Sequence, residues 1–231
     1  MAPVAFHYSR FARGGKPISE SATKPPRAGR PTKEQAEARQ AQLLDAALDL
    51  FLEQGFEQTT IEAIAAHVNM TKRTIYARYE DKRALFLAAV DRAIDRSLVP
   101  EERLAALDLD DLAGTLRAVA MMRVENVMTP QGLRLQRIIN TESYRFPEIF
   151  MRSYERSGHP PMQFVARLLR RHCDTGTLAI DDPQMAASIF MTMVVSGPVR
   201  IIVSGNPMPR DEIERRVDCA VRLFLDGARS R

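Results

Sequence analysis

The sequence predicts an all-α protein. Apolar residues recur at the helical spacing of three and four residues through most of the chain after residue 36. No segment alternates apolar and polar residues with the period of two that a half-buried strand requires. The 231 residues, 45% of them apolar, are enough for one small and one medium domain with a sizeable core.

The first 36 residues differ in composition from the rest. Residues 1–33 hold seven Lys or Arg and a single acid, Glu20, although the whole chain has a net charge of only +4. This stretch is rich in Pro, Gly and Ser and has no apolar period, so we expect residues 1–36 to form a largely disordered basic arm. Such an arm is typical of contact with nucleic acid, and a solubilising tail is the alternative.

Residues 37–97 predict four successive helices. The first carries an apolar stripe and ends at Gly55, and a capping box of Thr59 and Glu62 predicts the start of the second. Asn69 tolerates the turn that follows, because Asn accepts a positive φ better than other non-glycine residues. Thr71 can then cap the third helix and Asp81 the fourth.

The third predicted helix exposes basic and hydroxyl groups. Ile75 and Tyr79 point inward, whereas Lys72, Arg73 and Thr74 occupy the exposed first turn. Two short helices joined by a tight turn match a helix-turn-helix unit, whose second helix enters the major groove of DNA with its first residues at the base edges. The pattern therefore predicts an N-terminal DNA-binding head.

The stretch "LLDAALDLFLEQGFEQTTIEAIAAHVNMTKRTIYARYEDKRALF" resembles the TetR/AcrR-type bacterial transcriptional regulators over roughly residues 40–90. Asn69 replaces the glycine that the family usually has, and Arg73 stands where glycine is frequent. The resemblance implies a three-helix helix-turn-helix head whose DNA-facing residues are Thr60, Thr71, Lys72, Arg73, Thr74, Tyr76 and Arg78, with Lys82 on a phosphate. It also implies that residues 98–231 form a helical domain that dimerises and encloses a small-molecule pocket.

Further helix signals fill residues 98–231. Asp110 or Asp111 opens a helix that ends at Thr129-Pro130, and later helices are expected near residues 135–142, from Pro147, over 162–173, 183–204 and 211–228. Gly158-His159-Pro160-Pro161 is expected to break the chain, and Gly197-Pro198 to kink a helix. The helix from Pro183 is apolar nearly all round, so the last two helices are the predicted homodimer surface.

A ligand pocket is predicted among the middle helices. Its candidate lining is Val119, Met122, Asn126, Phe150, Tyr154, Phe164, Phe190 and Met193. Methionine and aromatic residues on helical stripes belong to a closed core more often than to a pocket, so a filled core is the alternative.

The predicted function is that of a cytoplasmic, ligand-responsive repressor that binds a palindromic double-stranded operator as a homodimer. No nucleophile motif, phosphate loop or spaced metal-ligand set is present, so no catalytic residue, metal or cofactor is expected. The apolar stretch from Met185 to Val199 is interrupted and predicts a buried core helix rather than a membrane span. A sequence-tolerant architectural DNA-binding protein and, less favoured, a helical enzyme are the alternative functions.

Overall fold

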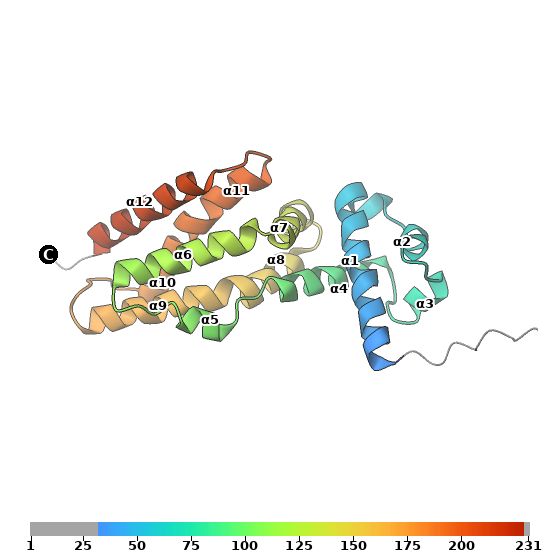
Figure 1. Ribbon diagram of the computed structural model, residues 1–231, viewed down its shortest axis with the longest axis horizontal. Coiled ribbons are helices and arrows are strands. Elements are labelled where there is room, and N and C mark those ends of the chain that lie inside the picture. Colours follow the sequence, from blue (N-terminus) through green and yellow to red (C-terminus); the bar gives the residue numbers. More distant parts are fainter. Residues whose placement is uncertain (1–31, 229–231) are drawn as a thin grey trace, which may run out of the picture.

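The computed structural model describes residues 32–228, and within them no β-strand forms. The chain folds into a small helical head and an elongated helical bundle, joined by α4 (Figure 1). The elements are α1 (Lys33–Gln58), α2 (Ile61–His67), α3 (Lys72–Tyr76), α4 (Lys82–Arg96), α5 (Glu101–Ala105), α6 (Leu112–Met128), α7 (Pro130–Glu142), α8 (Pro147–Ser153), α9 (His159–Asp174), α10 (Pro183–Met191), α11 (Gly197–Val203) and α12 (Arg210–Ala228), with π-helical turns at Tyr154–Gly158 and Thr192–Ser196. The all-α prediction is confirmed.

Local capping chemistry sets the helix starts. Asp81 accepts a hydrogen bond from the backbone N–H of Ala84 (2.7 Å) at the start of α4, as predicted. Thr32 and Gln35 form a reciprocal capping box, so α1 begins at Lys33, before the expected boundary at residue 37. Most of the predicted basic arm, residues 1–31, lies outside the described residues.

The start of α2 corrects the predicted capping box by one residue. Thr60, not Thr59, caps the helix, because its hydroxyl accepts a hydrogen bond from the N–H of Ala63 (3.1 Å). The hydroxyl of Thr59 is buried and donates instead to the carbonyls of Leu50 and Gly55. Thr59 therefore holds the residue that follows α1 against the last turns of that helix.

Both turns of the head use positive φ angles. Gly55 has φ +80° and interrupts the last turn of α1, and Asn69 has φ +51° between α2 and α3. Asn69 is the only non-glycine residue in residues 32–228 with a positive φ. Both positions were predicted from the tolerance of Gly and Asn for this conformation.

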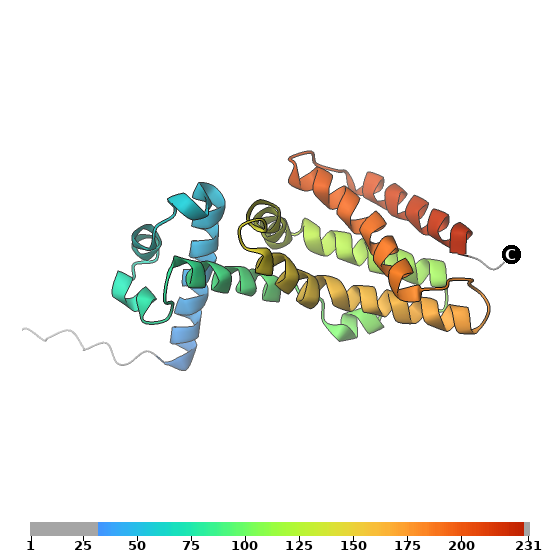
Figure 2. The ribbon, with the colours of Figure 1, turned by 180° about the vertical axis from the view of Figure 1, so that it is seen from behind.

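The bundle is built around α6, which is buried on nearly all sides. It contacts α7, α9, α11 and α12, and α10 packs along α9. Seen from behind, α10 and α11 form one long bent rod beside α12 (Figure 2). Asp111 and Asp182 cap α6 and α10 as predicted.

The predicted break at residues 158–161 does not occur. From α8 the chain continues through the π-helical turn Tyr154–Gly158 directly into α9, whose first turn contains Pro160 and Pro161. Each proline lacks the N–H that would continue the hydrogen-bond ladder, and the π-helical turn before them accommodates this loss without ending the helix. The kink expected at Gly197-Pro198 takes the form of the second π-helical turn, Thr192–Ser196.

The stretch Pro183–Val203 lies at the protomer surface rather than in the core. It is the one helical stretch of residues 32–228 that is long and apolar enough to cross a membrane by length and composition, and 28% of its most apolar window is buried. The prediction of a buried core helix is therefore wrong. Met185 and Ile189 are each 57% exposed, so this helix leaves an apolar face uncovered.

Candidate DNA-binding face and ligand cavity

Helix α3 presents one outward face from the head. Ile75 is completely buried, whereas the rest of the helix is exposed, including Lys72, Arg73, Thr74 and Tyr76. Thr71 caps α3 by accepting a hydrogen bond from the N–H of Thr74 (3.1 Å). This cap fixes the first turn, where the side chains of a recognition helix meet base edges.

Lys72 is already paired in the free protein. Its ammonium group forms an ion pair with Glu62 of α2, and it lies 5.6 Å from the centre of the Tyr76 ring. The hydrogen bond from Lys72 lowers the pKa of Glu62, and the same bond raises the pKa of Lys72. Arg73 has no such partner among the described residues, and its side chain is exposed.

The remaining predicted DNA contacts also hold the head together. Lys82 donates to the carbonyl of Glu57 (3.0 Å) and lies over the Phe56 ring, 4.6 Å from its centre. An ammonium group carries three N–H bonds, so this contact leaves two for a phosphate. Arg78 donates to Gln40 of α1 at 3.5 Å, and Thr60 caps α2.

A cavity of about 300 Å³ lies between α6, α7, α8, α9 and α10. Its described lining combines hydroxyl, amide, apolar and aromatic groups with a single charged side chain, Arg123. The lining residues are Arg123, Gln136, Ile139, Phe150, Ser153, Tyr154, Ser157, Gly158, Met162, Ser188, Met191, Thr192, Val195 and Ser196. Both π-helical turns contribute to this lining, and such turns often mark functional sites.

The predicted eight-residue pocket is not assembled. Only Phe150 and Tyr154 line this cavity, with their rings stacked and their centres 6.3 Å apart. The other six residues lie elsewhere. Val119, Met122 and Phe190 are buried in the core, and Asn126 donates a hydrogen bond to the carbonyl of Ser97 (2.7 Å). Phe164 lines a second cavity, and the side chain of Met193 is 38% exposed. The helical phase of α6 explains the error, because Arg123, one residue beyond Met122, faces the cavity instead.

Arg123 is the functional candidate that the sequence pattern did not reveal. It is 7% exposed, and its Nε and Nη1 atoms have no hydrogen-bond partner among residues 32–228. Burial lowers the pKa of Arg123 from its usual value. A signal existed in the sequence: Arg123 interrupts a run of apolar residues that extends from Val119 to Val124.

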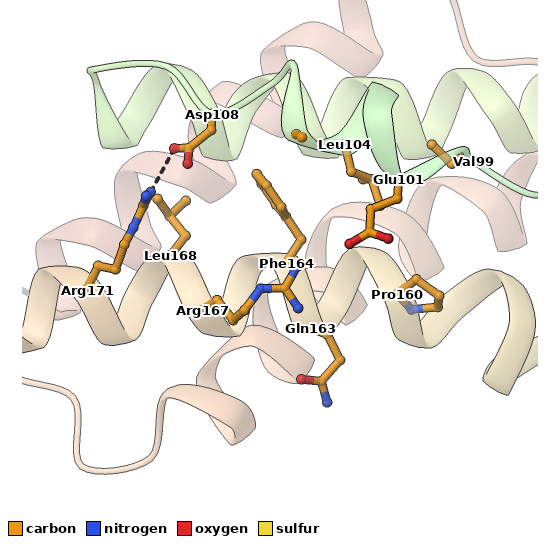
Figure 3. Close-up of a pocket in the computed structure, with 11 residues that line it drawn as sticks. Val99, Glu101, Leu104, Asp108, Pro160, Gln163, Phe164, Arg167, Leu168 and Arg171 are labelled. Carbon is orange, nitrogen blue, oxygen red and sulfur yellow. Dashed lines mark hydrogen bonds and ion pairs between the residues drawn. The ribbon is translucent and has the colours of Figure 1, made fainter.

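The second, larger cavity lies between α5 and α9 and measures about 580 Å³. Figure 3 shows Phe164 directed toward it between Leu104 and Leu168, with charged side chains around the apolar centre. Arg171 is paired with Asp108 across this cavity (2.7 Å). Its charge is therefore satisfied by the protein itself, unlike that of Arg123.

Two protein-family models match this chain. Residues 43–89 match the model described as bacterial regulatory proteins, tetR family, and residues 114–227 match that of the AefR-like transcriptional repressor C-terminal domain. The chain belongs to the TetR family of bacterial transcriptional regulators. The predicted helix-turn-helix regulator is thereby confirmed, and the architectural and enzymatic alternatives gain no support.

Individual relatives and solved structures agree with this assignment. The HTH-type transcriptional regulator TcmR of Streptomyces glaucescens is 30% identical over 138 residues, which cover 54% of this chain and 58% of TcmR. A TetR-family regulator from Mesorhizobium loti has the same fold, with a TM-score of 0.68 at 22% identity over 85% of this chain and 99% of that structure. The flavonoid-responsive regulator FrrA has a TM-score of 0.65 at 29% identity over 84% of this chain and 99% of its own.

Proposed function

We propose that this protein is a cytoplasmic, homodimeric repressor that binds a two-fold symmetric operator through α3 and releases it when a small molecule occupies the cavity beside Arg123. The exposed face of α3 carries this proposal, because Lys72, Arg73 and Thr74 project from a capped first turn while Ile75 is buried. Hydroxyl and basic groups in this arrangement suit base edges and phosphates.

The dimer surface that we propose comprises α10, α11 and α12. Exposed apolar side chains gather along this surface: Met185 and Ile189 on α10, Met193 in the π-helical turn after it, Ile201 on α11 and Leu223 on α12. Figures 1 and 2 place α11 and α12 side by side along one edge of the bundle. The bent rod of α10 and α11, together with α12, gives two long helical segments in each protomer, so the dimer would form a four-helix interface. A two-fold dimer implies a palindromic operator.

The path from the cavity to the head runs through α7 and α8. Ile139 of α7 lines the cavity and also belongs to the apolar core of the head. Ion pairs join the same regions: Arg152 of α8 contacts Asp91 of α4 at 2.5 Å, and Arg83 of α4 pairs with Glu148 of α8. A ligand that favours one position of α7 and α8 would thus shift the head, through its different affinity for the two arrangements.

The operator can be obtained by selecting bound duplexes from a random pool with the full chain. We expect Arg73→Ala to weaken binding of the selected duplex by about 1–3 kcal/mol, as the loss of a base-edge contact does. Arg103→Ala, which removes an exposed arginine from α5, is the matched control and should bind normally. Unchanged binding by Arg73→Ala, or failure to enrich any sequence, would contradict the proposed role of α3.

A further inference from the structure

The guanidinium of Arg123 is an unbalanced charge inside the bundle. Two of its nitrogen atoms are buried without a hydrogen-bond partner in the described chain, and the side chain is 7% exposed. No carboxylate of residues 32–228 forms an ion pair with it, although many other arginines of this protein have one. Burying a charge without a partner is costly, so such a group is kept where something else supplies the partner.

The only charge in the described lining of the cavity at Arg123 is positive. Among its described lining residues there is no Asp or Glu, and Arg123 is the only charged side chain. A cationic ligand would meet an unscreened positive charge, and a neutral ligand would leave the guanidinium without a counter-charge. An anionic oxygen group removes both problems, and a carboxylate matches the two parallel N–H bonds of a guanidinium.

The other lining residues define the rest of the ligand. Phe150 and Tyr154 form a stacked aromatic pair at the exposed side of the cavity, and Met162, Met191 and Val195 add apolar surface. Serine and threonine hydroxyls from both π-helical turns and from α8 and α10 can bond to a few oxygen atoms. A volume of about 300 Å³ lies at the small end of the range for ligand pockets.

We propose that the cavity binds a small organic carboxylate, whose apolar or aromatic body lies against Phe150, Tyr154 and Met162 while its carboxylate pairs with Arg123. This inference rests on the proposed function, in which the same cavity is the effector site, and it names the chemical class of the effector. The α5–α9 cavity is not chosen, because Arg171 there already pairs with Asp108, Arg167 is exposed to solvent, and Glu101 adds a negative charge to the lining.

Three probes with the same naphthyl ring test which ligand charge the cavity prefers: the anion 2-naphthoate, the neutral 2-naphthamide and the cation 2-naphthylmethylamine. Calorimetry and thermal melting of the full wild-type chain, without DNA, should show 2-naphthoate bound about tenfold to a hundredfold more tightly than the amide, as expected for a hydrogen-bonded charge pair. Arg123→Met should abolish this preference. Arg167→Met, which removes an exposed arginine of the α5–α9 cavity, should keep it.

Arg123→Met should also fold, because it replaces an unpaired buried charge with an apolar side chain of similar length. If it does not fold, the three-probe comparison in the wild type and in Arg123→Lys still decides the matter, since Lys keeps the charge but loses the paired N–H geometry and should lower the preference. Equal binding of the amide or the amine, a preference that survives Arg123→Met, or no binding of millimolar 2-naphthoate would overturn the proposal.

The experiments distinguish failure of the carboxylate site from failure of the proposed repressor function. A chain that binds its selected operator but shows no preference for the carboxylate refutes this inference and leaves the DNA-binding role intact. A chain that shows the preference but selects no duplex refutes the proposed repressor function while the site at Arg123 stands.

Discussion

The ring of Phe146 packs edge-on against that of Phe56, with their centres 4.8 Å apart and their planes at 69°. Phe56 lies near the end of α1, and Phe146 directly precedes α8. Phe86 of α4 completes the cluster, 5.1 Å from Phe146. A residue from the bundle half of the sequence is thus part of the core of the head, and it joins the start of α8 to α1 and α4.

Replacing Phe146 by Ala should destabilise the protein by about 3–5 kcal/mol, the usual cost of removing a buried aromatic ring. Phe146 is 4% exposed, so little water can fill the space that the ring leaves. Urea unfolding measures the change. Tyr144→Ala, two residues earlier and fully exposed, should cost almost nothing, and equal losses in the two variants would contradict this role of Phe146.

The close contact of Gly132 in α7 with the backbone of α6 predicts that a larger residue there destabilises the fold. A Cβ atom added at Gly132 would lie 2.5 Å from the carbonyl oxygens of Asn126 and Val127, both of them backbone atoms that cannot rotate away. Gly132→Ala should therefore destabilise the fold by about 1–3 kcal/mol through overpacking. Gly227→Ala in α12, where the new methyl group meets no described atom within 4 Å apart from the neighbouring backbone of its own helix, should be neutral or slightly stabilising. Thermal melting of both variants distinguishes strain at Gly132 from a general effect of alanine.

The sequence predicted most features that depend on neighbouring residues only, although the cap of α2 is Thr60 and not Thr59. Thr71, Asp81, Asp111 and Asp182 cap helices as expected, because a cap bonds to N–H groups two or three residues away. The break expected at Gly158-Pro160 does not occur, because the conformation there depends on packing against distant parts of the chain rather than on neighbouring residues. Packing of α8 and α9 against the bundle carries the helix through a π-helical turn, and no local signal contains that packing.

The ligand site was less predictable than the fold. Met122 and Arg123 are neighbours in sequence, yet one is buried in the core and the other lines the cavity. Periodicity shows that α6 is apolar on several sides, but it does not show which side meets a filled core and which meets a void. The buried charge is the more informative residue, because only its unpaired state distinguishes the cavity from ordinary core.

Acid should weaken the contact between α1 and α4. Burial alone would raise the pKa of Asp45, but hydrogen bonds and charges from Arg92 and Arg96, with N–O distances of 3.0 Å, outweigh it and hold the pKa below 3.8. A carboxyl group with a lowered pKa stabilises the fold above its unfolded-state pKa, and this contribution disappears as the pH falls through the folded-state value.

Asp45→Asn should therefore lower stability at neutral pH by up to about 1 kcal/mol, since the pair is partly exposed and screened by solvent. The difference from the wild type should shrink as the pH falls below about 4, where the wild-type carboxyl also becomes neutral. Urea unfolding across this pH range measures both effects. Glu80→Gln, an exposed carboxyl group without an ion pair among the described residues, is the control, and a pH-independent difference for Asp45→Asn would rule out this pairing as the cause.

The proposed dimer surface predicts that a charged residue on α12 lowers the mass of the protein in solution from that of a dimer toward that of a monomer. Leu223 is 63% exposed on α12, and an aspartate there would place a charge inside the proposed four-helix interface. Leu223→Asp should shift the protein from dimer toward monomer in sedimentation equilibrium and should weaken operator binding through loss of the second half-site. Leu109→Asp, at a 50% exposed position before α6, should stay dimeric. A dimeric Leu223→Asp protein would place the interface elsewhere.

The pairing of Lys72 with Glu62 predicts a gain in DNA binding. The two side chains are about equally exposed, at 52% and 59%, and the carboxylate would repel a phosphate that approaches Lys72. Glu62→Gln should therefore tighten binding to every duplex, with a logarithmic salt dependence steeper by about 0.9 if Lys72 gains one phosphate contact. Glu102→Gln, on α5 and away from the head, is the control for net charge. Adding Lys72→Ala to Glu62→Gln should cancel the gain, because the cycle of single and double variants isolates the coupling of this pair. A gain that persists without Lys72 would mean that Glu62 acts on DNA by its own charge alone.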